Sequence, residues 1–324
     1  APWMYRETLD LELEDAAGRR FRASLPYLEP DAVSLELGEA ELYPGFSVVM
    51  ERFNFNVLRP DDGRPIVLLQ WLDFEYELIQ DIVDLMEYAE AQGLLGHMMV
   101  IDVTASSGGS RGAYAIQRLV DKPFRTTFGN LRISDAAVDM VKAWATEPDR
   151  DVPEIFGLNE SRSWLHEWAR TNAREDIEAG LEYTRDTPFK LAHLPQEAED
   201  GILHPAEVHF SGPIAIIGGP NGGSHLDQFV SMFADNDLAF TIGMPTGGYS
   251  NTWEAEETVY FPGTEQPVVQ FMWNIGHTVR PNGQILEGNA VQPEVYVPLT
   301  RENFRTYHRD LLDAALRRLG RPVS

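Results

Sequence analysis

The chain has 324 residues, of which 43% are apolar, so it is long enough to bury a large core and to form two subdomains. Aspartate and glutamate outnumber lysine and arginine by 51 to 26, and the resulting formal net charge of -25 disfavours nucleic acids and anionic membrane surfaces as partners. The sequence has no cysteine and no apolar run long enough to span a membrane, which excludes disulfides, thiol nucleophiles and a membrane-spanning helix.

Alternating apolar and polar residues near the start of the chain predict a β-hairpin. The alternation runs through residues 8–28 on both sides of a turn at residues 16–18. We assign residues 1–30 to this N-terminal hairpin and interpret it as the remnant of an upstream domain.

A strand-helix pattern follows and predicts the first half of an α/β domain, residues 31–135. Residues 65–74 and 97–103 are apolar runs typical of buried strands. Apolar residues recur at helical spacing between them, at Leu78, Ile79, Ile82, Val83, Met86 and Ala89. A second helix is expected from about Arg111, and this β-α-β-α order indicates a parallel sheet.

Residues 136–200 are polar and rich in helical patterns, and we expect them to form a helical insertion or cap. Trp164 and Trp168 are four residues apart and therefore share one helical face. That face either lines an apolar lid over a site or packs into the core.

Residues 201–324 predict the second half of the α/β domain. Strands are expected at 213–217 and 238–242, with a helix between them. The last helix is expected to begin at Thr300, a residue type that caps helices, and to carry arginines in its final turns.

The stretch "GGPNGGSHLDQF", residues 218–229, places four glycines around Ser224 between a buried strand and a helix. A phosphate-binding loop would need a lysine where Ser224 stands, and the hydrolase elbow would need a glycine at Leu226. Two interpretations remain. Ser224 and Asp227 form a capping box, or Ser224 is a nucleophile whose oxyanion is held by amides at the helix start.

The sequence resembles the C-terminal processing, or tail-specific, serine protease family in three stretches. The first, "IDVTASSGG", places Asp102 on the family's aspartate and Gly108 and Gly109 on its glycine pair. The second runs from Ser224 to Tyr249 and has the family's length from nucleophile to general base. The third, "RPNGQILEGNAVQPEVYVPLT", is similar to the family's terminal pattern. The resemblance implies an α/β fold with a crotonase-like or tail-specific-protease-like sheet, split between residues 31–135 and 201–324.

The resemblance also implies roles for single residues. Ser224 falls on the nucleophile, and the oxyanion hole is implied to use the amide of His225 with that of Gly108 or Gly109. Asp227 and Asp235 fall on two supporting acidic positions.

The family's basic lysine is replaced by Tyr249, and no lysine follows Ser224. Burial turns a lysine into a base but keeps a tyrosine protonated, so Tyr249 is expected to be a hydrogen-bond donor. A branch similar to the tricorn core uses a histidine oriented by a glutamate. Glu287 lies where that glutamate is expected, but Gln70 and Trp71 stand where the histidine would be.

A further candidate base is His277, on the strand expected after Tyr249, with a structural or surface role as the alternative. We therefore expect a serine hydrolase of the peptidase type with a non-standard base, acting on a peptide or another acyl substrate. The alternative is a non-catalytic or re-purposed relative that binds an extended peptide or a small ligand in the same cleft.

No metal or cofactor is expected, because the eight histidines show no ligand spacing. The resemblance implies a periplasmic or secreted protein, and the sequence leaves the oligomeric state open.

Overall fold

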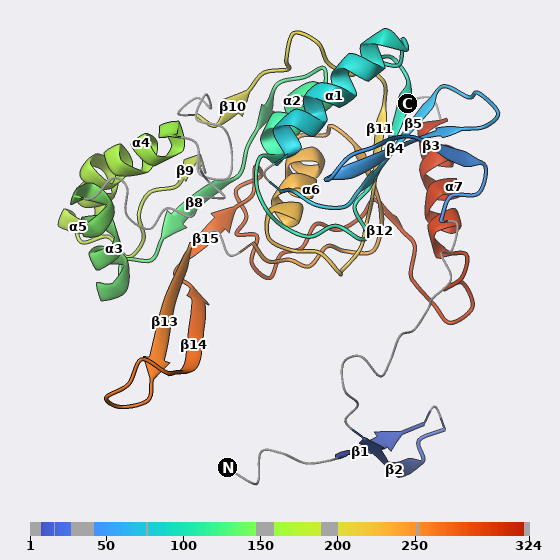
Figure 1. Ribbon diagram of the computed structural model, residues 1–324. Helices are drawn as coiled ribbons and strands as arrows, with labels where there is room; N and C mark the ends of the chain where they lie inside the picture. Colours follow the sequence, from blue (N-terminus) through green and yellow to red (C-terminus); the bar gives the residue numbers. More distant parts are fainter. Residues whose placement is uncertain are drawn as a thin grey trace. The chain divides into compact units, whose positions relative to one another are not determined.

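The computed structural model describes residues 8–15, 17–26, 42–75, 77–146, 159–188, 200–250 and 253–320 (Figure 1). The chain divides into two units, residues 1–42 and 43–324. The first unit contains strands β1 (Thr8–Glu14) and β2 (Arg20–Pro26), which pair antiparallel. The expected N-terminal hairpin is therefore confirmed.

The second unit is built on a seven-stranded sheet in the order β16-β12-β11-β6-β5-β4-β3. Its strands are β3 (Phe46–Glu51), β4 (Phe55–Pro60), β5 (Ile66–Trp71), β6 (Met98–Asp102), β11 (Ile214–Gly218), β12 (Phe240–Gly243) and β16 (Val295–Tyr296). The pairs from β16 to β5 are parallel, and β4 and β3 extend the sheet antiparallel. Strands β5, β6 and β11 are almost wholly buried, as expected of parallel strands covered on both faces. The four strands expected in this domain are confirmed as β5, β6, β11 and β12.

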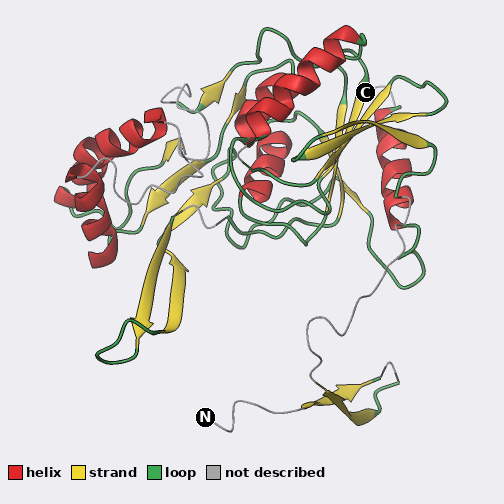
Figure 2. Ribbon diagram, viewed as in Figure 1, coloured by secondary structure: helices red, strands yellow, loops and turns green. Residues whose placement is uncertain are grey.

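Helices cover both faces of this sheet (Figures 1 and 2). On one face, α2 (Gly112–Leu119) contacts both α1 (Leu78–Ala91) and α6 (His225–Asp235). On the other face, α7 (Tyr307–Leu319) packs against β6, β11 and β12. The centre of the core is aromatic, because the Trp71 ring lies 4.9–5.3 Å from three phenylalanine rings, those of Phe55, Phe74 and Phe229.

The helical segment has a core cluster of its own. It contains α3 (Asp135–Thr146), α4 (Asn159–Trp168) and α5 (Arg174–Glu178), the last two joined by the π-helical turn η4 (Ala169–Ala173). The Trp253 ring lies 5.3 Å from that of Trp168 and 5.7 Å from that of Trp144, and all three are buried. The interpretation as a lid surface is wrong for Trp168, which packs in this core instead.

Three smaller sheets complete the second unit. Strands β15 (Gly276–Val279), β8 (Phe128–Leu131) and β9 (Thr187–Pro188) form one, and β7 (Phe124–Arg125) pairs with β10 (Ile202–Leu203). Strands β13 (Glu254–Tyr260) and β14 (Pro267–Asn274) form an exposed hairpin that we did not expect. The Pro262-Gly263 dipeptide between the two strands is a turn signal from which this hairpin could have been predicted.

The start of the last helix differs from the prediction. Residues 301–306 form turns, and α7 begins at Tyr307. The Asn303 side chain accepts a hydrogen bond from the Thr300 amide at 2.7 Å, and the Thr300 hydroxyl accepts one from the Asn303 amide at 3.3 Å. These are the two bonds that a capping box uses, but turns rather than a helix follow them, so Thr300 does not cap α7.

Within the described ranges, no helix has both the length and the apolar character needed to cross a membrane.

Candidate active site

Ser224 ends the loop of residues 219–224, which leads from the carboxyl end of β11 to the start of α6. We call these residues the serine loop. The backbone of Ser224 has φ 56° and ψ -130°, a conformation that residues other than glycine rarely adopt. The Ser224 amide donates a hydrogen bond to the Tyr249 carbonyl at 2.8 Å, which helps to hold it there.

Gly108 lies directly against Ser224. A Cβ atom at Gly108 would overlap Ser224 Cβ, and it would lie 2.7 Å from Ser224 Oγ and 3.4 Å from the His225 amide nitrogen. Gly108 belongs to the loop after β6, whereas Ser224 belongs to the loop after β11, the neighbouring strand. The carboxyl ends of adjacent parallel strands therefore bring the two loops together.

Gly109 lies against a different segment, the backbone at Phe74. It has φ 140°, and a Cβ atom there would overlap the Phe74 carbonyl oxygen. The next amide, that of Ser110, donates to the same oxygen at 3.0 Å. Gly109 thus lets the chain after β6 pass close to the backbone at Phe74.

The capping-box interpretation of Ser224 and Asp227 is wrong. The Ser224 side chain forms no capping hydrogen bond at the start of α6. Asp227 Oδ2 instead accepts hydrogen bonds from the amides of Gly248 at 3.0 Å and Tyr249 at 3.4 Å. Asp227 therefore fixes the loop that carries Tyr249, and the Ser224 side chain has no role in capping the start of α6.

Burial raises the pKa of Asp227 above its ordinary value of 3.8, and a hydrogen bond with Thr246 and those from the two amides oppose this rise. Because the folded protein holds this proton more tightly than the unfolded chain, the contribution of Asp227 to the free energy of unfolding must fall as the pH rises from 3.8 through the folded pKa. We expect Asp227→Asn to remove this fall. Urea unfolding of both proteins between pH 3.5 and pH 7 measures the difference.

Asp62→Asn is the control with the opposite sign. The Arg64 amide lowers the pKa of Asp62, so this carboxylate favours the folded state more as the pH rises through 3.8. The free energy of unfolding of wild type minus that of Asp227→Asn should fall as the pH rises. A difference that stays level or increases with pH would contradict the burial of Asp227.

His225 points away from the serine hydroxyl and into the core. Its Nε2 accepts a hydrogen bond from the Gly112 amide at 2.8 Å, and its ring lies 5.3 Å from that of Phe74 in an edge contact. A Cβ atom at Gly112 would lie 2.7 Å from Nε2. The side chain therefore ties the start of α6 to the start of α2, while the His225 amide stays near Gly108. The role of the His225 amide stays a prediction, and nothing in the sequence indicated the contact with Gly112.

Tyr249 lies beside the serine loop. A Cβ atom at Gly223 would lie 2.5 Å from Tyr249 Cε1, so the ring packs directly on this glycine. The side chain is 47% exposed. Among the described residues, no side chain forms a hydrogen bond with the Ser224 hydroxyl, and Tyr249 is no exception.

Of the other two candidate catalytic residues, His277 lies on β15 and Glu287 is hydrogen-bonded to that strand. The His277 ring stacks on Tyr183 at 4.8 Å, and Glu287 Oε2 accepts a hydrogen bond from the Thr278 amide at 3.0 Å. In the part of the chain that the structure describes, neither is hydrogen-bonded to Ser224.

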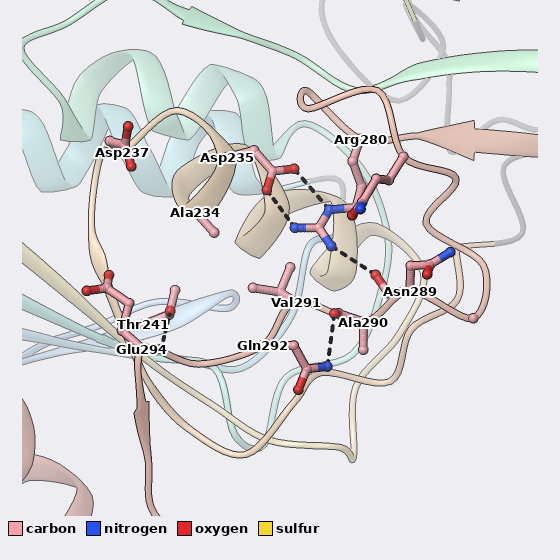
Figure 3. Close-up of a pocket in the computed structure, with 12 residues that line it drawn as sticks. Ala234, Asp235, Asp237, Thr241, Arg280, Asn289, Ala290, Val291, Gln292 and Glu294 are labelled. Carbon is pink, nitrogen blue, oxygen red and sulfur yellow. Dashed lines mark hydrogen bonds and ion pairs between the residues drawn. The ribbon is translucent and has the colours of Figure 1, made fainter.

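Asp235 forms a buried ion pair with Arg280 at the far end of α6 (Figure 3). Its two oxygens accept hydrogen bonds from Arg280 at 2.6 Å and 2.9 Å, and Arg280 also donates to the Asn289 carbonyl at 3.0 Å. The pair borders a cavity of about 540 Å³. Because α6 has 11 residues, Asp235 lies about 16 Å along the helix from Ser224. Asp235 therefore supports the packing of α6 rather than the chemistry at its start.

Asp102, at the end of β6, is buried and orients the chain that leads to Gly108. Its Oδ1 accepts hydrogen bonds from the Thr104 amide at 2.9 Å and the Thr104 hydroxyl at 2.7 Å, and its Oδ2 accepts one from the Tyr43 hydroxyl. Burial and the nearby Asp102 raise the pKa of Tyr43, which keeps this hydroxyl a donor.

The described residues contain no group of three or more histidine, aspartate or glutamate side chains that could hold a metal ion.

No family model matches the chain, and no curated protein matches it. Solved structures match its fold. For mature CPAF complexed with lactacystin the TM-score is 0.62 at 16% identity, covering 97% of this chain and 68% of that one. For a putative peptidase from Parabacteroides merdae the TM-score is 0.55 at 13% identity, covering 87% and 70%.

The photosystem II D1 C-terminal processing protease also matches, with a TM-score of 0.43, 12% identity and coverage of 95% of this chain and 60% of that one. The first two likenesses show a shared fold and confirm the predicted α/β class.

Proposed function

We propose that this protein is a serine hydrolase of the peptidase type, in which Ser224 attacks a peptide or another acyl substrate. The observation that carries the proposal is the backbone of Ser224, which has a positive φ directly before α6 and presses against Gly108. This conformation costs about 1–3 kcal/mol, and such strained residues gather at active sites. The fold shared with a putative peptidase supports the same conclusion.

In this proposal the amides of His225 and of Gly108 or Gly109 hold the oxyanion. The His225 amide nitrogen and Ser224 Oγ both face the space that a side chain at Gly108 would fill. An oxygen bound in this space would therefore lie near the nucleophile and near the first amide of α6.

We further propose a non-standard base that reaches Ser224 when substrate is bound. Hydrogen bonds of catalytic bases are often long in unliganded enzymes and tighten in the substrate complex. Tyr249 packs on the serine loop and has a hydroxyl, so it acts in this proposal as a donor that positions the substrate or the serine.

A fluorophosphonate probe followed by intact mass measurement tests the nucleophile. We expect wild type to gain one adduct and Ser224→Ala to gain none. Ser231→Ala is the matched control and should label like wild type, because Ser231 lies in the same helix, is buried and bonds the Gln228 carbonyl at 2.8 Å. An unlabelled wild type that still hydrolyses a peptide would overturn the assignment of Ser224.

A binding protein is the second candidate, favoured by the lack of any described side chain hydrogen-bonded to the Ser224 hydroxyl. In that case wild type stays unlabelled and hydrolyses no peptide, but still binds an extended peptide or a small ligand beside the serine loop.

A further inference from the structure

A second cavity, of about 460 Å³, opens beside the serine loop on the side of α7. We call it the α7 cavity. Its walls come from the loop after β6 at residues 104–106, from the serine loop at residues 219–221, and from the segment that leads into α7. Met244, Leu299, Phe304 and Tyr307 supply its apolar surface.

The α7 cavity lies within reach of Ser224 along two independent paths of the chain. Ser106 is two residues from Gly108, and Asn221 is three residues from Ser224. Because an extended chain spans at most about 3.6 Å per residue, these wall residues lie within about 7 Å of Gly108 and about 11 Å of Ser224. A peptide whose backbone passes Ser224 can therefore place a nearby side chain in the cavity.

The chemistry of the wall favours an apolar group. Leu299 is 50% exposed and Phe304 is 61% exposed, so both offer apolar surface that a ligand would cover. The described residues that line the cavity include no aspartate, glutamate, lysine or arginine, so a charged side chain would lose water without gaining an opposite charge.

Two polar side chains of the wall, those of Thr104 and His308, already have hydrogen-bond partners. The Thr104 hydroxyl donates to Asp102 at 2.7 Å and lies 3.1 Å from His308 Nε2, so its oxygen is the acceptor for His308. An apolar ligand therefore does not strip these groups of their partners. The volume also fits, since an engineered cavity of about 150 Å³ already holds a benzene ring.

We propose that the α7 cavity binds a large apolar side chain, leucine-sized or aromatic, of a peptide whose backbone passes Ser224. This inference rests on the proposed function, because it takes the substrate to be a peptide, and it adds the class of residue that the site selects.

Binding to the Ser224→Ala protein tests the proposal without catalysis. Fluorescein-labelled peptides of the form Ser-Ala-X-Ala-Ser, with X as phenylalanine, leucine, alanine, glutamate or lysine, are compared by fluorescence anisotropy at pH 8. We expect the phenylalanine and leucine peptides to bind at least about tenfold more tightly than the others, because burying such a side chain is worth that much.

Two variants of the wall locate the effect. Phe304→Ala removes exposed apolar surface, and Ala105→Phe fills the cavity from an exposed position, so both should reduce the preference to less than about threefold. Phe261→Ala is the matched control, because this exposed phenylalanine lies at the turn of the β13–β14 hairpin, and it should keep the full preference.

Equal affinities for all five peptides, or no binding of any, would overturn the proposal, as would an unchanged preference in both wall variants. A fluorophosphonate probe without a peptide side chain reports on Ser224 separately. If wild type is labelled but the five peptides bind equally, only the proposal for the α7 cavity is refuted. If the phenylalanine peptide is preferred but wild type is never labelled, only the assignment of Ser224 as nucleophile is refuted.

Discussion

Replacing Gly108 by alanine is expected to slow fluorophosphonate labelling of Ser224 at least about a hundredfold, because a misplacement of about 1 Å at a reacting group has that effect. The new Cβ would overlap Ser224 Cβ and lie 2.7 Å from the hydroxyl oxygen, well inside the contact distance of about 3.5 Å. Ser224 or the loop after β6 must therefore move, and the space for an oxyanion closes. Pseudo-first-order labelling rates measured by intact mass test this expectation.

Gly96→Ala is the matched control for this experiment. Gly96 precedes β6, has no atom within 4 Å of an added Cβ and does not have a positive φ, so its variant should label at the rate of wild type. Thermal unfolding of both variants shows whether they are folded at the labelling temperature. A folded Gly108→Ala protein that labels as fast as Gly96→Ala would contradict the contact between Gly108 and Ser224.

Replacing Arg280 by methionine is expected to lower the free energy of unfolding by about 3–5 kcal/mol. The side chains of Arg280 and Asp235 are only 8% and 6% exposed, so the variant leaves a buried carboxylate. Its remaining described hydrogen-bond partner is the side-chain amide of Asn282, at 3.0 Å. Methionine is unbranched and apolar and fills much of the same volume, so most of the effect comes from the unpaired charge rather than from an empty space. Urea unfolding at pH 7 measures the loss.

The double variant Arg280→Met with Asp235→Leu should recover most of this stability, because it removes both charges. Arg64→Met is the control at the surface. Its ion pair with Asp62 has side chains that are 51% and 56% exposed, and such pairs contribute at most about 1 kcal/mol. A loss at Arg280 no larger than the loss at Arg64 would contradict the burial of the pair.

Four of the seven strands of the sheet could be predicted from short stretches of sequence, because each lies in a mainly apolar run bounded by loops. The runs that became β5, β6, β11 and β12 were visible for this reason. The start of α7 was not, because Thr300 bonds Asn303 in a turn instead of capping a helix. A capping box and a turn can use the same pair of hydrogen bonds, so the sequence does not show whether a helix follows them.

The candidate site was predicted in part. The spacing of the glycines, with the resemblance to tail-specific proteases, brought Ser224, Gly108 and His225 together before the fold was known. The pattern of Ser224 and Asp227 equally allowed a capping box. In the structure the Asp227 carboxylate instead accepts a hydrogen bond from the Gly248 amide, 21 residues further along the chain, so no capping box forms.

The sequence by itself determined the charge, the absence of thiol chemistry, the α/β class and the loop that holds the serine, because these depend on composition and on neighbouring residues. The tertiary structure alone decided that Asp235 pairs with Arg280, 45 residues away, that His225 meets Gly112, and that a cavity lies between the serine loop and α7. Contacts between distant segments depend on how the elements pack. The same packing holds Ser224 at a positive φ against Gly108, a strained conformation that its own sequence would not favour.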